Sequence, residues 1–339
     1  MFNKKQILLG HGSGGRLSHE LITQIFIRHF DNSELNKQGD SAILTFAEEK
    51  LAFTTDSFVV DPLFFSGGDI GKLAVAGTVN DLAVAGAEPR YLSASFIIEE
   101  GLPFNTLEKI VISMAEEAKA AGVKIVTGDT KVVDRGKCDK LFINTSGIGT
   151  LISGAEGIAE GMKLKAGDKI IINGHIGDHG MAVMSARNQL QIHADLQTDC
   201  ASLNHMIKKI LETIPDIHFM RDATRGGLAT VLAEIADKDN VGIELDESNI
   251  PVRDSVKGMC ELLGFDPLYV ANEGKVVMVV GAESAEAVIN SLQEFKLGKN
   301  SAVIGEIVAD HPGRVWLHTQ IGGTRIVDML AGEQLPRIC

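Results

Sequence analysis

The sequence predicts a two-domain protein of the α/β or α+β class. A chain of 339 residues is longer than one hydrophobic core usually organises. Hydrophobic residues make up 45% of it and charged residues 23%, which is typical of a globular protein. Segments of helical periodicity alternate with short apolar runs in both halves. Because a Gly-rich stretch at 151–167 separates the halves, we expect domains at 1–155 and 156–329 and a tail at 330–339.

The first half is predicted to combine strands with two long helices. Residues 70–87 are mostly small and apolar, which favours a closely packed helix. An amphipathic pattern at 107–121 predicts a second helix that ends at Gly122. The run at 123–127 predicts a buried strand leading into a loop at 128–131. The other expected elements are a helix at 17–30, a hairpin of strands at 42–46 and 51–55, and strands at 90–100 and 141–150.

The second half is predicted to continue with alternating strands and helices. Its strands are expected at 169–173, 241–245, 275–280, 301–308 and 314–318. Its helices are expected at 178–190, 201–212, 226–237, 253–263 and 283–295. Neither a solenoid repeat nor a low-complexity segment is present in the sequence.

Charge and hydropathy limit the classes of partner. The net charge of −13 argues against nucleic acid or an anionic membrane surface as the main partner. A phosphorylated ligand stays compatible, because a bound divalent cation reverses the local charge. No apolar run reaches membrane-spanning length, and the first one stops at Gly10 and His11, too short for a signal peptide. We therefore expect a cytoplasmic protein.

Cysteine usage singles out the last residue. Cys138, Cys200 and Cys260 are scattered without a CxxC pair, which fits a reducing compartment and structural roles. Cys339 ends the chain, where backbone is usually most mobile. A thiol there is expected to be poorly placed for packing and well placed for transfer chemistry. The alternative is a frayed tail that ends in Cys by chance.

Acidic residues follow predicted strands or interrupt apolar segments. Asp40 precedes the first hairpin strand, Asp56 follows the second, and Asp129 follows the run at 123–127. Asp81 lies inside an apolar helix, where a carboxylate is costly unless it is paired or bound to a cation. Each of the other three could instead be a helix cap or a turn residue. Together they predict a Mg²⁺–nucleotide site with these four residues as ligands.

Gly-rich loops supply candidate phosphate contacts. The loop of Gly12, Ser13, Gly14 and Gly15 precedes a predicted helix, whose N-terminus favours anions. A plain flexible loop is an equal alternative, because the sequence lacks the Walker A pattern. Asp222 begins a similar loop at 222–227. We expect it to act either as a helix cap or as a contact to a phosphate or a cation.

Two further segments carry polar groups beside strands. The loop at 173–180 holds two His and an Asp among Gly residues, and such loops usually bind a ligand. We expect substrate or interface contacts there rather than a metal. The segment at 271–275 precedes a buried strand and contains Glu273, our candidate general base; the alternative for it is a turn.

Taken in order, these motifs resemble the PurM-like ATP-binding superfamily, which includes aminoimidazole ribonucleotide synthetase, selenophosphate synthetase and thiamine-phosphate kinase. Within it, the resemblance to the HypE family of carbamoyl dehydratases covers essentially the whole chain. The motifs that carry it are His11–Gly15, Asp56–Pro62, Thr78–Ala87, Gly128–Val133, Asn173–Gly180, Asp222–Gly227, Ala271–Lys275 and Pro336–Cys339.

The resemblance implies a homodimer with a shared β-barrel, and ATP bound near the domain and dimer interfaces. It implies that a HypF-like carbamoyltransferase loads Cys339, that ATP then drives dehydration to a thiocyanate, and that a HypC–HypD-like scaffold receives the cyanide on iron. Lys131 is our candidate contact to the transferring phosphoryl group, with a surface ion pair as the alternative. The expected nucleotide contacts are the Gly12–Gly15 loop, Asp56, Asn80, Asp81, Gly128, Asp129, Thr130 and Asp222.

The tail of ten residues can span up to ~35 Å, so we expect one position inside against ATP and one outside. Two other functions compete with this one. The first is another ATP-dependent kinase or synthetase, for which Cys339 would be dispensable. The second is a non-catalytic scaffold that presents a thiol to metal-assembly partners, for which ATP would bind weakly or not at all.

Overall fold

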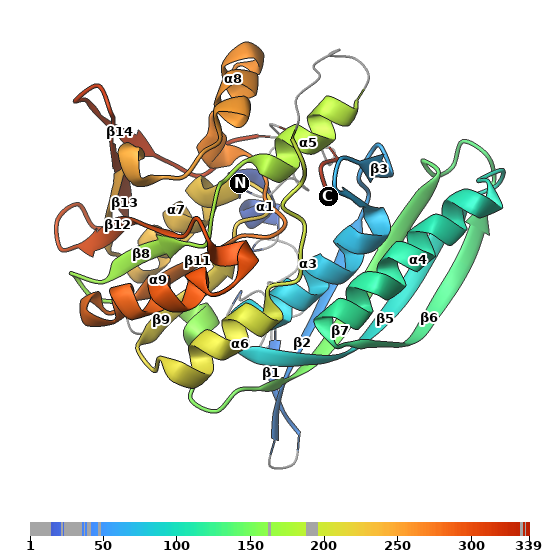
Figure 1. Ribbon diagram of the computed structural model, residues 1–339, viewed down its shortest axis with the longest axis horizontal. Coiled ribbons are helices and arrows are strands. Elements are labelled where there is room, and N and C mark those ends of the chain that lie inside the picture. The colour runs from blue at the N-terminus through green and yellow to red at the C-terminus, as the bar shows by residue number, and fades with distance from the viewer. Residues whose placement is uncertain are drawn as a thin grey trace.

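The structure is a computed structural model that describes residues 15–21, 23, 36, 38, 42–46, 49–161, 164–187, 196–332, 335 and 337–339. The first half forms a five-stranded sheet in the order β1-β2-β7-β5-β6, in which only the β5–β6 pair is parallel. Helices α3 and α4 cover one face of this sheet (Figure 1). The bounds are α1 Gly15–Leu21, β1 Ala42–Phe46, β2 Glu49–Phe58, β3 Phe64–Phe65, β4 Gly68–Asp69, α3 Ile70–Val84, β5 Ala87–Glu99, α4 Phe104–Ala121, β6 Lys124–Val133 and β7 Leu141–Leu151.

The second half forms a seven-stranded sheet in the order β14-β13-β10-β12-β8-β11-β9. Its strands are β8 Lys169–Ile172, β9 Ile217–Asp222, β10 Gly242–Asp246, β11 Val276–Val280, β12 Ala302–Val308, β13 Arg314–His318 and β14 Thr324–Val327. Its helices are α5 Asp178–Ala186, α6 Asn204–Thr213, α7 Gly227–Asp239, α8 Asp254–Leu263 and α9 Ala285–Gln293. Alternate β11 residues pack with α7 on one face, whereas the others pack with α6 and α9 on the opposite face. Burial on both faces explains why β11 is a continuous apolar run.

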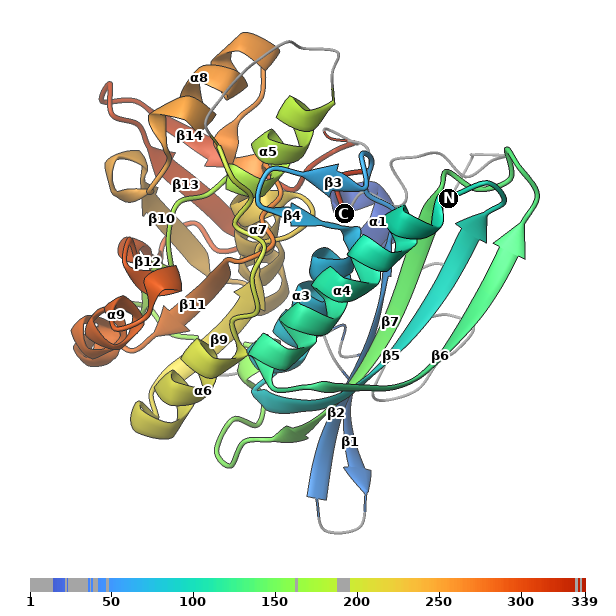
Figure 2. The same cartoon turned by 45° about the vertical axis from the view of Figure 1, so that its right-hand side comes forward.

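Helix α3 lies where the two halves meet. It packs against α4, β2 and β7 of its own half and against α6 and β9 of the other. Its Asp69 cap accepts the N–H of Gly71 at 2.7 Å and of Lys72 at 3.2 Å. Small side chains let neighbouring elements approach all around it, as the sequence predicted, and leave little of the helix exposed. Helix α3, whose sequence includes Asn80 and Asp81, thus lies between the two halves (Figure 2).

Three predictions of secondary structure need correction. The run at 123–127 belongs to edge strand β6, which is exposed along almost its whole length rather than buried. This strand continues through Gly128–Lys131, which we expected to be a loop, because it pairs with β5 as far as Val133. The strands β9 and β14 had no counterpart in our prediction.

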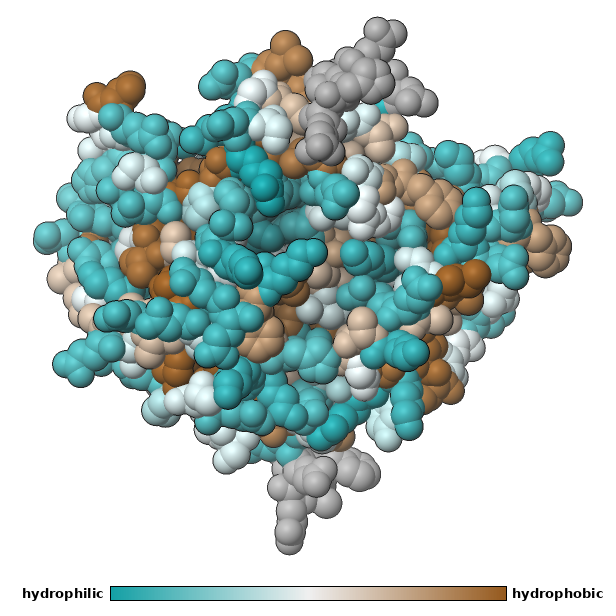
Figure 3. Space-filling model, viewed as in Figure 1, coloured by the Kyte–Doolittle hydropathy of each residue, from teal (hydrophilic) through white to brown (hydrophobic). Residues whose placement is uncertain are grey.

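The two faces of the molecule differ in polarity. Figure 3 shows the face that carries α4, α6 and α9, where hydrophobic side chains form small separate groups among hydrophilic ones. In contrast, the strands of the N-terminal sheet expose apolar side chains over several neighbouring strands, namely Phe53, Tyr91, Ile97, Ile125, Val126, Val132 and Ile148. Among the described helices, none is long and apolar enough to span a membrane.

Candidate active site

The end of the chain is packed inside the molecule. The Cys339 main-chain oxygen accepts the N–H of Val59 at 3.0 Å, and the Arg337 carbonyl accepts the N–H of Asp61 at 3.3 Å. Ile338 is only 4% exposed, and Cys339 packs against a hydrophobic cluster to which both halves contribute. In both ribbon views the C-terminus lies close to β3 (Figures 1 and 2). The expectation that this residue is poorly placed for packing is therefore wrong for this state.

Charged side chains from three segments surround the thiol of Cys339. Burial, together with the carboxylates of Glu273 and Asp56, raises its pKa to about 12, and the guanidinium of Arg225 opposes this rise. The same proximity raises the pKa of Arg225, chiefly through Cys339. Asp222, the last residue of β9, also contributes to the rise in the thiol's pKa. The predicted residues Cys339, Glu273, Asp56 and Asp222 are thus brought together.

Glu273 is a buried carboxyl group in this cluster. It is 3% exposed, and burial raises its pKa well above the ordinary value, helped by the nearby carboxylates of Asp222 and Asp199. A carboxylate with a raised pKa is a stronger base than an exposed one. The structure is therefore compatible with Glu273 as a proton acceptor close to the sulfur.

A rigid scaffold holds the backbone of Glu273. The Asp199 carboxylate accepts the main-chain N–H of Glu273 at 3.1 Å and of Gly274 at 3.2 Å. Lys275 pairs with this carboxylate at 2.9 Å, with both side chains buried. Although burial opposes it, the charge of Lys275 and hydrogen bonds from Lys275 and the Glu273 main chain hold the pKa of Asp199 below its ordinary value. Residues 272–275 are thereby fixed as part of the site.

Asn80 has a positioning role in this scaffold. It is 2% exposed, and its amide donates to the carbonyls of Ala201 at 3.0 Å and Glu273 at 3.3 Å. Its side-chain oxygen accepts the N–H of Leu203 at 2.8 Å. All three hydrogen bonds connect the Asn80 side chain to main-chain atoms of the site. Contact between Asn80 and a nucleotide stays a prediction.

Of the four predicted magnesium ligands, Asp56 and Asp81 lie near Arg225, whose pKa both carboxylates raise. Asp81 also accepts a hydrogen bond from Thr54 Oγ1 at 2.8 Å. Carboxylate oxygens are the donors that Mg²⁺ prefers, so these two residues fit the ion. Within the part of the chain that the structure describes, no group of three or more His, Cys, Asp or Glu is arranged to hold a metal. Asp40, Gly12, Ser13 and Gly14 lie outside the described residues.

The predicted residues on β6 are not part of the cluster around the thiol. Lys131 pairs with Asp129 at 2.9 Å, with side chains 70% and 63% exposed. Asp129 also accepts the N–H of Thr130 at 2.8 Å. Gly128 is needed for packing, because a Cβ there would lie 2.0 Å from the Ala94 carbonyl oxygen. Neither charged residue is among the groups that most shift the pKa of Cys339 or Glu273.

The remaining predicted loops surround the tail. Gly15, at a φ of +73°, begins α1 against the Leu330 carbonyl, where the tail starts. In the loop at 173–180, Asp178 pairs with Arg253 at 3.0 Å and His179 contacts the tail. Sequence reasoning did not single out Arg225 or His179 as site residues, although both lie in loops that it marked.

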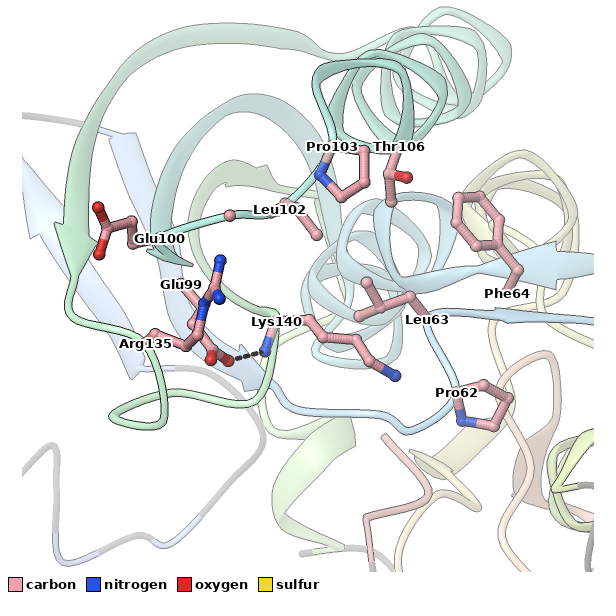
Figure 4. Close-up of a pocket in the computed structure, with 11 residues that line it drawn as sticks. Pro62, Leu63, Phe64, Glu99, Glu100, Leu102, Pro103, Thr106, Arg135 and Lys140 are labelled. Atoms are coloured by element: carbon pink, nitrogen blue, oxygen red, sulfur yellow. Dashed lines mark hydrogen bonds between the residues drawn. The ribbon is translucent and has the colours of Figure 1, made fainter.

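A cavity of about 520 Å³ adjoins the docked tail. Figure 4 shows apolar side chains such as Leu63, Leu102 and Pro103 on one side of it and Arg135 and Lys140 on the other. Lys140 also pairs with Asp61 at 3.6 Å, the residue whose main-chain N–H binds Arg337. The cavity is therefore next to the tail but separate from the carboxylate cluster.

Comparison with known proteins places this geometry in a family. The N-terminal domain of AIR synthase related protein matches residues 38–151, and the C-terminal domain of that family matches residues 165–318. A thiamine monophosphate kinase from Aquifex aeolicus shares the fold at 16% identity, with a TM-score of 0.66 over 89% of this chain and 97% of its own. These matches show the PurM-like two-domain α/β fold.

More similar proteins narrow the assignment. The carbamoyl dehydratase HypE of Rhodobacter capsulatus is 48% identical over 99% of this chain and 98% of its own length. A crystal structure of HypE in complex with ATP is 49% identical, with a TM-score of 0.81 over 98% of this chain and all of its own. The structure of a HypE–HypF complex has 49% identity and a TM-score of 0.86 over 91% of this chain and 99% of that one. The half-buried terminal cysteine beside a carboxylate cluster is thus found on the fold of these relatives, and the chain belongs to the HypE family of carbamoyl dehydratases.

Proposed function

We propose that this protein uses ATP to dehydrate a carbamoyl group carried on the thiol of Cys339, which gives a thiocyanate that donates cyanide to iron during maturation of a [NiFe]-hydrogenase. The observation that carries the proposal is the docked tail, which brings the sulfur beside Glu273, Arg225 and two further carboxylates. A relative's structure contains ATP, which supports the same nucleotide here.

The chemistry proceeds in two steps at the carbamoyl group. The carbamoyl oxygen attacks the γ-phosphorus of ATP, which releases ADP and makes the oxygen a phosphate leaving group. Loss of two protons from nitrogen and of phosphate from carbon then leaves S–C≡N. Glu273 is our candidate acceptor of an N–H proton, and Arg225 can balance negative charge beside the sulfur.

Asp56 and Asp81, with Asp40 and Asp129 as further predicted ligands, would hold Mg²⁺, which when bound neutralises phosphate charge. Lys131 stays our proposed contact to the transferring phosphoryl group. Its ion pair with Asp129 is exposed, so both side chains are open to an arriving nucleotide. The Gly12–Gly15 loop, Asn80, Gly128, Thr130 and Asp222 stay proposed nucleotide contacts.

Loading of the thiol is proposed to take place outside the protein's own site. With a pKa near 12, the docked thiol is almost entirely protonated at neutral pH and is a poor nucleophile. A HypF-like carbamoyltransferase therefore meets the released tail, in agreement with the HypE–HypF complex of relatives. The product would pass to a HypC–HypD-like iron scaffold.

We also propose a homodimer formed through the uncovered face of the N-terminal sheet. This face exposes Phe53, Tyr91, Ile97 and Ile148 by 40% to 49%. A patch of apolar side chains across neighbouring strands is typical of a protein–protein contact. Ile148→Glu should give monomers in light-scattering measurements if this face pairs with a second copy.

Intact-mass spectrometry tests the proposed reaction. The protein is incubated with the carbamoyltransferase, carbamoyl phosphate and ATP. A gain of one carbamoyl group on Cys339, followed by an ATP-dependent loss of one water, is expected. Product formation by Cys339→Ser would instead support another kinase or synthetase, and an Asp81→Asn variant with full function would support a scaffold without catalysis.

A further inference from the structure

The docked tail is held through its main chain rather than through the sulfur. His179 Nε2 lies 2.8 Å from the Ile338 carbonyl oxygen, and Arg187 Nη2 donates to the Arg337 carbonyl at 2.6 Å. Val59 N–H binds the Cys339 main-chain oxygen at 3.0 Å. Each of the last three residues is therefore held at its main chain. The Arg337 side chain adds a hydrogen bond to the Val59 carbonyl at 3.0 Å and an ion pair with Asp139.

The two side chains come from opposite ends of one helix. His179 lies in the first turn of α5 and Arg187 is its C-cap, so ~12 Å of helix separates them. Arg187 also donates from Nε to the Asp61 carbonyl at 2.7 Å, in the segment that pairs with the tail from the other side. Helix α5 belongs to the C-terminal half and Asp61 to the N-terminal half. Arg187 therefore ties the tail to both halves at once.

The hydrogen bonds around His179 fix its tautomer. Thr198 Oγ1 accepts the Cys200 N–H at 3.0 Å, so its hydroxyl hydrogen is available to His179 Nδ1 at 2.8 Å. Nδ1 is then the acceptor, and Nε2–H is the donor to the Ile338 carbonyl. Burial lowers the pKa of His179, which agrees with a neutral ring.

We propose that His179 and Arg187 form a latch, here called the α5 latch, that positions the tail for the reaction through its carbonyl oxygens and without a bond to the sulfur. A latch that binds carbonyl oxygens holds the free thiol, the carbamoylated residue and the thiocyanate in the same register. The inference rests on the proposed function for its purpose, but the latch itself can be measured without any catalysis.

The first experiment measures access to the thiol. Full-length protein is treated with iodoacetamide at pH 7.5 without ATP, and modification of Cys339 is followed on the C-terminal peptide released after Glu333. Arg187→Ala removes two charge-assisted hydrogen bonds from the tail and its neighbour, so the rate should rise roughly 10- to 100-fold. Arg187→Lys should restore part of the protection, because one donor can still reach a carbonyl.

Arg253→Ala is the matched control. Arg253 also contacts α5, through Asp178 at 3.0 Å, but it is not bonded to the tail. Its modification rate should stay within threefold of the wild type, and a thermal melt checks that each variant is folded. Equal rates for Arg187→Ala and wild type, or equal acceleration by Arg253→Ala, would overturn the latch.

A second experiment tests whether the latch holds the tail without a bond to the sulfur. Trypsin cleavage after Arg337 is compared for wild type, Cys339→Ser and Cys339→Ala at pH 7.5. Cleavage rates within threefold of each other are expected. A rate ten times higher for Cys339→Ala would mean that the sulfur itself holds the tail, and would overturn the proposal. Because neither experiment uses ATP or a carbamoyl donor, a failed dehydration assay leaves the latch intact and removes only the proposed function.

Discussion

Raising the pH should release the docked tail, because the inner site holds Cys339 only as a neutral thiol. Its pKa is raised from an ordinary value near 9 to about 12 in the docked state. A group with a raised pKa favours the docked state fully below pH 9, and this advantage falls as the pH rises from 9 towards 12. At pH 10 the released thiol is about 90% ionised and the docked one about 1%, so docking should weaken about 10-fold.

The assay is the rate of trypsin cleavage after Arg337, measured between pH 7 and pH 10 as loss of the terminal dipeptide. Cys339→Ser provides the control, because it lacks the titrating group but shares the main-chain contacts of the tail. Dividing the wild-type rate by the variant rate removes the pH dependence of trypsin. The ratio should be near one at pH 7.5 and rise about 10-fold by pH 10. A flat ratio would refute the reasoning that burial suppresses ionisation of this thiol.

Four further predictions concern the proposed base, the metal, the charge at the end of the tail and the stability of the second half. Glu273→Gln should still bind ATP and accumulate the carbamoylated protein, with dehydration slowed by at least ~100-fold in a mass-spectrometric time course; water loss at the wild-type rate would remove Glu273 as the base. Asp56→Asn should weaken ATP binding ~10-fold in the presence of Mg²⁺ but leave metal-free binding unchanged by calorimetry; equal losses in both conditions would argue against a metal ligand. One Gly added after Cys339 should speed cleavage of the tail several-fold, because a neutral carbonyl then replaces the charged carboxylate that accepts the Val59 N–H; unchanged protection would show that this charge does not hold the tail. His218→Gln should lower the free energy of unfolding by ~2–4 kcal/mol in urea without changing tail cleavage, because it removes the imidazole that lies 2.7 Å from the fully buried carboxylate of Asp168; a loss below the error of the measurement would contradict this.

Local sequence patterns were sufficient to predict most of the fold. The packed helix α3, the amphipathic helix α4 with its Gly122 end, and the β1–β2 hairpin were predicted from spacing and turn residues. The prediction for β6 was wrong because the apolar residues at 123–127 suggest a buried strand. In the structure β6 is an edge strand, and almost all of its side chains are exposed. A pattern of hydrophobicity cannot distinguish a buried core face from a face that a partner would cover.

Part of the candidate site could be predicted and part could not. Asp56, Asp222 and Glu273 were each predicted as site residues, but their grouping was not predicted, because Asp56 lies inside β2 and Asp222 ends β9, a strand that the pattern did not indicate. The docked position of Ile338 could not be predicted, because its contacts lie more than 100 residues away in sequence, on α5 and the segment after β2. Asn80 was predicted to face a nucleotide, but its three bonds to main chain appear only when the halves are assembled.

The segment 198–200 positions both the latch and the proposed base. Thr198 holds His179, whose ring binds the tail, and Asp199 holds the main-chain N–H of Glu273. The backbone of Thr198 is in turn bonded to the Ser66 carbonyl at 2.9 Å, in the N-terminal half. Because one short segment positions both groups, seating Ile338 against His179 also sets the distance between the sulfur and Glu273. A tail that leaves for a partner, as proposed above, would return to the same geometry, because the segment 198–200 holds both His179 and the main chain of Glu273 in place.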